Sequence, residues 1–164
     1  MYGEDSIKDS AFYDLGSGIG RGVIAAAFLS PFQKCVGIEY LQQLHSIALN
    51  IKSKFEKKFE EIFTSHKNDY FANYKSIPEI EIINDDFLKH SWKDASFILA
   101  NSTCFSADLM SALAKKAENE LQSGAFFVTF TKRLPNLGTN WDLRDGFRRL
   151  MSWGIATIYI HRKI

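Results

Sequence analysis

The chain has 164 residues, of which 46% are hydrophobic and 24% charged, so it can bury a core and is too apolar to be disordered. Its formal net charge of +1 excludes a protein that is strongly basic throughout, and its longest uncharged run, residues 95–107, is too short to span a membrane. Two cysteines cannot form a four-cysteine metal site or a disulfide framework, so we expect no metal. We predict a single domain over residues 1–164 in an intracellular compartment, cytoplasmic or nuclear.

The first half of the chain alternates between apolar strands and amphipathic helices. Residues 11–15 are predicted to form a buried strand, and a glycine-rich turn leads from it into an alanine-rich helix that ends near Ser30. A second strand is predicted over 34–39. A long helix follows, because apolar residues recur every three or four positions from Leu41 to Ile62. Residues 64–78 are predicted to form a polar loop.

The second half repeats this alternation and then changes. Strands are predicted over 79–83, 96–100 and 125–130, with a helix over 108–121, and residues 146–163 are predicted as two strands with a turn near Trp153 and Gly154. Strands that alternate with helices imply a mostly parallel sheet. We therefore predict an α/β fold with a Rossmann-like, doubly wound sheet that ends in an antiparallel β-hairpin. Ligands of such a sheet bind beyond the carboxyl ends of its strands.

The turn after the first strand is the most informative motif. Gly16, Gly18 and Gly20 alternate, and Asp14 stands two residues before the first of them. A dinucleotide fingerprint counted from Gly16 would need glycine or alanine where Arg21 stands, which disfavours an NAD-dependent oxidoreductase. A carboxylate beside the loop disfavours a phosphate and favours a ligand with an amino group, such as the methionine end of S-adenosyl-L-methionine.

Polar residues follow three other strands. Glu39 ends the second strand and could accept both hydroxyls of a ribose, and Asp86 could accept from an adenine amino group. Phe87 could cover the adenine ring, while Asn101 and Ser102 could orient a methyl acceptor after the fourth strand. Each position also has a purely structural alternative: a helix-terminal acid, a capping Asp with a core Phe, and an Asx or Ser turn.

Together these residues resemble class I S-adenosylmethionine-dependent methyltransferases, and most closely their non-SET histone-lysine branch, the disruptor-of-telomeric-silencing family. The resemblance covers nearly the whole chain. The segments that carry it are Tyr2-Gly3-Glu4, the loop from Asp14 to Gly20, Val36-Gly37-Ile38-Glu39, Asp86-Phe87-Leu88, Trp92, Asn101 with Phe105, and Ser152-Trp153 followed by Tyr159 and His161.

The resemblance implies S-adenosyl-L-methionine as the cofactor and a protein lysine of a histone-like substrate as the acceptor. The net charge of +1 gives no strong nucleic-acid signature, and the short uncharged runs predict no membrane partner. The implied cofactor-binding residues are Asp14, Gly16, Ser17, Gly18, Gly20, Glu39, Asp86, Phe87, Asn101, Tyr2 and Glu4. The implied catalytic residues are Asn101 and Ser102, and the implied substrate channel is formed by Phe105, Trp153 and Tyr159.

Three features depart from the family pattern. Residues 1–10 are a shortened N-terminal loop, Ser102 replaces a second asparagine, and Ile158 stands where the family has a channel tyrosine. These departures keep two alternatives open. One is a non-catalytic module that binds S-adenosylmethionine or a protein partner, and the other is a methyltransferase that acts on a small molecule or on RNA.

Overall fold

The computed structural model describes residues 10–66 and 69–164. The chain is divided into two compact units, the first ending at Phe87 and the second beginning at Leu88. Tyr2 and Glu4, which the resemblance implies as cofactor-binding residues, lie outside the described residues. No helix in the described part is both long and apolar enough to cross a bilayer.

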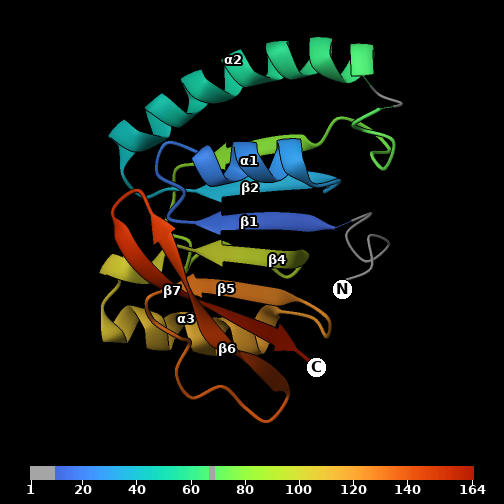
Figure 1. Ribbon diagram of the computed structural model, residues 1–164. Coiled ribbons are helices and arrows are strands. Elements are labelled where there is room, and N and C mark those ends of the chain that lie inside the picture. Colours follow the sequence, from blue (N-terminus) through green and yellow to red (C-terminus); the bar gives the residue numbers. More distant parts are fainter. Residues whose placement is uncertain (1–9, 67–68) are drawn as a thin grey trace. The chain divides into compact units, whose positions relative to one another are not determined.

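Three parallel strands form the sheet of the first unit, in the order β3-β2-β1. They are β1 (Ala11–Leu15), β2 (Lys34–Ile38) and β3 (Glu79–Ile83). Helix α1 (Arg21–Leu29) packs on β1 and β2, and α2 (Gln42–His66) packs on β3 and α1 (Figure 1). Leu15 pairs with Ile38, which pairs with Ile83, so all three strands end level at one edge of the sheet.

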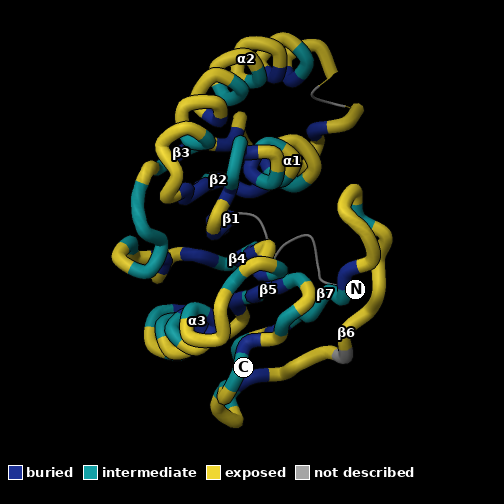
Figure 2. Tube along the Cα trace, turned by 90° about the vertical axis from the view of Figure 1, so that its left-hand side faces the viewer, coloured by how far each residue is buried: buried dark blue, intermediate teal, exposed yellow. Residues whose placement is uncertain are grey.

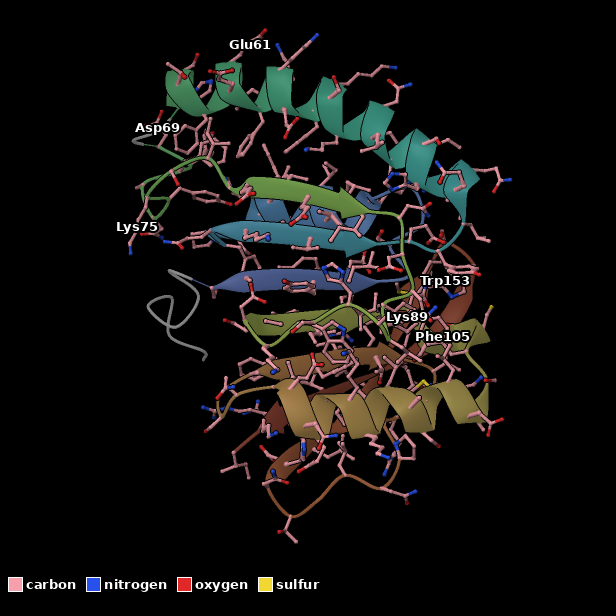
Figure 3. The ribbon with its side chains drawn as sticks, turned by 180° about the vertical axis from the view of Figure 1, so that it is seen from behind. Glu61, Asp69, Lys75, Lys89, Phe105 and Trp153 are labelled. Carbon is pink, nitrogen blue, oxygen red and sulfur yellow. The ribbon has the colours of Figure 1, made fainter. Side chains whose placement is uncertain are left out.

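Helix α2 buries one aromatic side and exposes a charged one. Its Phe59 packs in a cluster with Phe71 and Tyr74, which come from the segment after the helix, and the ring centroids of Phe59 and Phe71 lie 5.4 Å apart. Glu61 points away from the strands in Figure 3, and Figure 2 shows the outer side of the helix as exposed. The predicted polar loop over 64–78 is thus wrong in two respects: the helix continues to His66, and two aromatic residues of the segment belong to the core.

The second unit combines parallel and antiparallel strands in the order β4-β5-β7-β6. β4 (Ala95–Ala100) and β5 (Phe126–Phe130) are parallel, with α3 (Ala107–Glu120) between them in the chain, whereas β7 (Gly154–Lys163) is antiparallel to both β5 and β6 (Trp141–Met151). The predicted fold class is confirmed, including the turn near Trp153. The predicted start of the hairpin at residue 146 is wrong, because β6 begins at Trp141 and continues through an irregularity between Arg144 and Phe147.

The β6–β7 hairpin is longer than the strand on which it pairs. Phe130, the last residue of β5, pairs with Ile158, and the N–H of Thr131 donates to the Thr157 carbonyl. The beginning of β7 and the turn before it therefore extend past the carboxyl end of β5. In Figure 1 this turn lies at the end of the second unit to which β4 and β5 point.

Candidate functional site

The loop after β1 has a backbone that only glycine adopts without strain. Gly16, Gly18 and Gly20 have φ angles of 77°, 56° and 82°, in the left-handed region that L side chains rarely enter. The N–H groups of Gly16 and Ser17 donate to the Ile38 carbonyl over 2.9 and 3.1 Å, which fastens the loop to the end of β2. The alternating glycines are therefore required by the fold of the loop, and they bring bare backbone to the edge where ligands of such sheets bind.

Gly37 in β2 makes room for this loop. A Cβ atom at Gly37 would lie 2.8 Å from the Ser17 hydroxyl oxygen and 2.8 Å from Cγ2 of Val23, distances that real Cβ contacts do not reach. The Ser17 hydroxyl is buried and has no hydrogen-bond partner among the described residues. The predicted site residue Ser17 thus packs behind the loop, against β2, which Glu39 directly follows.

The Glu39 carboxylate is buried and already organised. It is 6% exposed, and its two oxygens accept from the N–H of Gly18 over 2.8 Å and from the N–H of Leu41 over 2.9 Å. A carboxylate has about four acceptor positions, so each oxygen keeps a lone pair for another donor. Two neighbouring acceptors of this kind match the paired hydroxyls of a ribose.

Asp14 differs from Glu39 because no described residue donates to its carboxyl group. It is 6% exposed, at the end of β1 beside the glycine loop. Burial, and secondly the charge of Glu39, raise the pKa of Asp14 to about 7. Burying a carboxyl group without a partner is costly, so the arrangement is suited to a ligand that brings a cationic donor.

The residues after β3 complete this edge of the first unit. The predicted site residues Asp86 and Phe87 follow β3 and are half-buried. Asn84 was not predicted as a site residue, yet its side-chain Nδ2 donates to the carbonyls of Glu39 over 2.8 Å and Tyr40 over 3.1 Å. An asparagine directly after a strand is the only trace that this link leaves in the sequence.

In the second unit, Asn101 and Ser102 have different surroundings. Ser102 is fully buried, and its hydroxyl donates to the Phe130 carbonyl over 2.6 Å, which joins the short 3₁₀ helix η2 (Ser102–Cys104) to the end of β5. Asn101 is exposed, and its Oδ1 accepts from the Thr103 hydroxyl over 3.0 Å. The Asn101 side chain is therefore open to solvent, whereas the Ser102 hydroxyl holds the turn in place.

The three predicted channel residues all belong to the second unit. Phe105 is half-buried directly after η2, and its carbonyl accepts from the Lys132 ammonium. Trp153 is 53% exposed in the hairpin turn. Figure 3 shows Phe105 and Trp153 at the same end of the unit. Tyr159 is half-buried, with the Arg133 guanidinium 5.3 Å from its ring centroid. Within the described residues, no group of three or more His, Cys, Asp or Glu side chains could hold a metal ion.

Solved methyltransferases share the fold of this chain. An rRNA methylase from Streptococcus thermophilus matches 98% of this chain and 91% of its own with a TM-score of 0.66 at 11% identity. TrmN from Thermus thermophilus matches 98% of this chain and 46% of its own, with a TM-score of 0.64 at 15% identity. An RNA methyltransferase from Salinibacter ruber was solved with S-adenosyl-L-homocysteine. It matches 96% of this chain and 84% of its own, with a TM-score of 0.58 at 21% identity. At these identities the likeness concerns the fold.

Sequence comparison is more specific. A histone-lysine N-methyltransferase of Caenorhabditis elegans, H3 lysine-79 specific, is 33% identical over 129 residues, which are 79% of this chain. This chain spans 13% of the length of that relative. The family described as histone methylation protein DOT1 matches residues 5–145, which include the glycine loop, Glu39, Asp86 and Asn101. The chain therefore belongs to the DOT1 family of histone methylation proteins.

Proposed function

We propose that this chain binds S-adenosyl-L-methionine and transfers its methyl group to a lysine of a histone. The observation that carries the proposal is the buried Asp14 carboxyl group, which has no donor among the described residues and lies beside the glycine loop. A cationic amino group satisfies such an acid, and the methionine end of the cofactor carries one. The family and the H3 lysine-79-specific relative support the lysine acceptor. A histone acceptor and this relative support a reaction in the nucleus.

Each part of the cofactor has a group suited to it in the first unit. Asp14 pairs with the amino group, and the bare backbone of the glycine loop lets the methionine end approach closely. Glu39 accepts the two ribose hydroxyls with the lone pairs that Gly18 and Leu41 leave free. The carboxylate of Asp86 accepts from the adenine amino group, with Phe87 against the ring.

The acceptor side is assigned to the second unit. When bound, the cofactor would supply a methyl group attached to a positively charged sulfur. The lone pair of a neutral lysine amine would form the new N–C bond to that methyl carbon, and the electron pair of the broken C–S bond would leave with the sulfur as a neutral thioether. The lysine loses a proton to water before it reacts. Oδ1 of Asn101 keeps a second lone pair, which can accept an N–H of the amine and orient its free electron pair. Ser102 is the positioning residue for Asn101, and Phe105, Trp153 and Tyr159 line the channel.

Two measurements test the proposal separately. S-Adenosylhomocysteine at about 100 times its Kd should add about 2.7 kcal/mol to the unfolding free energy and raise Tm by about 5–10 °C, whereas NAD should not. Labelled S-adenosylmethionine with nucleosomes or histones should label a histone lysine, and Asn101→Ala should lose that activity. No shift with S-adenosylhomocysteine would contradict the cofactor. Binding without labelling would contradict the acceptor.

A further inference from the structure

Asn84 joins the ends of β2 and β3 with its side chain. The last ladder pair of these strands is Ile38 with Ile83, and beyond it the Glu39 N–H donates once more, to the Ile83 carbonyl over 2.9 Å. Glu39 and Tyr40 follow the last ladder pair in the chain, and Nδ2 of Asn84 donates to both of their carbonyls. A primary amide has two N–H donors, so one nitrogen can serve both carbonyls.

This link acts on the residue that carries the buried carboxylate. The carboxylate of Glu39 spans two anchors, the N–H groups of Gly18 and Leu41, and the Asn84 amide fixes the backbone between them. A shift of the Glu39 backbone would move the carboxylate and the direction of its free lone pairs together. We infer that Asn84 is a positioning residue for ribose recognition, which holds Glu39 where its carboxylate meets the two ribose hydroxyls. This inference rests on the proposed function of the site.

The contribution of Asn84 to this geometry can be separated from a contribution to stability. Asn84 is exposed, so its truncation leaves no cavity in the core, whereas Glu39 is buried and depends on its anchors. Asn84→Asp keeps the shape but removes both donors. It places an acceptor against two carbonyl oxygens and adds a negative charge near Glu39. The aspartate variant should therefore bind ribose worse than the alanine variant.

The test compares two ligands by calorimetry: S-adenosylhomocysteine and an analogue that lacks both ribose hydroxyls. Asn84→Ala should weaken the affinity for S-adenosylhomocysteine by about 5- to 10-fold and the affinity for the analogue by less than about twofold. The reason is that only S-adenosylhomocysteine has the hydroxyls that bind the Glu39 carboxylate. Asn50→Ala, which removes an exposed asparagine of α2, is the matched control and should behave as wild type. Should Asn84→Ala fail to fold, Asn84→Ser retains one donor and should give a smaller loss with the same selectivity.

Amide hydrogen exchange provides a readout without ligand. In Asn84→Ala the N–H groups of Gly18 and Leu41 should exchange about tenfold faster, because both are bonded to the Glu39 carboxylate. Equal weakening of both ligands, or unchanged exchange at these two amides, would overturn the inference. If the wild-type chain binds no S-adenosylhomocysteine, the proposed function fails instead, and the exchange rates alone decide whether Asn84 positions Glu39.

Discussion

Binding of S-adenosylhomocysteine should remove a proton from Asp14. Burial, and secondly the charge of Glu39, raise the pKa of Asp14 to about 7, so this carboxyl group is partly protonated near neutral pH before a ligand binds. The amino group of the ligand pairs with the ionised carboxylate only. Binding must therefore ionise Asp14, and the affinity should increase as the pH rises towards 8.

The magnitude follows from the pKa. With a pKa of about 7, Asp14 is about nine-tenths protonated at pH 6 and about one-tenth protonated at pH 8. The Kd should thus be about tenfold weaker at pH 6 than at pH 8, and binding at pH 7 should release about half a proton. Without ligand, the contribution of Asp14 to the free energy of unfolding is fully present below pH 3.8, its ordinary pKa. This contribution is lost as the pH rises through about 7.

Calorimetry in two buffers with different ionisation enthalpies measures the proton release directly. Asp14→Asn removes the titrating group, so this variant should bind weakly and without the tenfold pH dependence. A wild-type Kd that stays constant between pH 6 and pH 8, or a reaction that releases no proton at pH 7, would refute the reasoning.

Three further predictions concern buried residues of the two units. Gly37→Ala should abolish binding of S-adenosylhomocysteine and lower Tm, because the new Cβ would lie 2.8 Å from the Ser17 hydroxyl oxygen; a folded variant with wild-type affinity would speak against this. Burial lowers the pKa of His161, whose two ring nitrogens bond backbone groups of Leu134 and Phe127. The contribution of His161 to stability is therefore complete above about pH 6.5 and is lost as the pH falls. Between pH 5 and 7, the free energy of unfolding in urea should depend less on pH in His161→Gln than in the wild type. Ser102→Ala should lower the unfolding free energy by about 1–2 kcal/mol, because the Phe130 carbonyl loses its donor, and an unchanged urea midpoint would contradict that role.

The features that sequence alone predicts are those encoded locally. Apolar runs bounded by glycine or proline mark the strands, and the spacing of glycines marks the loop, because each reflects the conformation of a few adjacent residues. Asp14 and Glu39 were placed by the same logic, as residues at strand ends. The structure adds why three glycines are needed: all three have positive φ.

The features that were missed depend on contacts between distant residues. Asn84 bonds the carbonyl of a residue 45 positions away, and Ser102 bonds one 28 positions away, so neither role leaves a local pattern. Phe71 was assigned to a loop because its neighbours are polar, although it packs in the core. The start of β6 at Trp141 was missed because strongly polar residues follow it, and pairing with β7 rather than its own pattern defines the strand.

In the proposed function, Asp14 and Glu39 bind two parts of the cofactor, the amino group and the ribose, that are unchanged when the methyl group leaves. The by-product, S-adenosylhomocysteine, would keep both of these contacts and would lose only the methyl group and the charge on sulfur. The site would therefore bind the by-product about as tightly as the methyl donor, and the by-product would inhibit the proposed reaction. The rate of that reaction would then follow the ratio of methyl donor to by-product rather than the amount of donor alone.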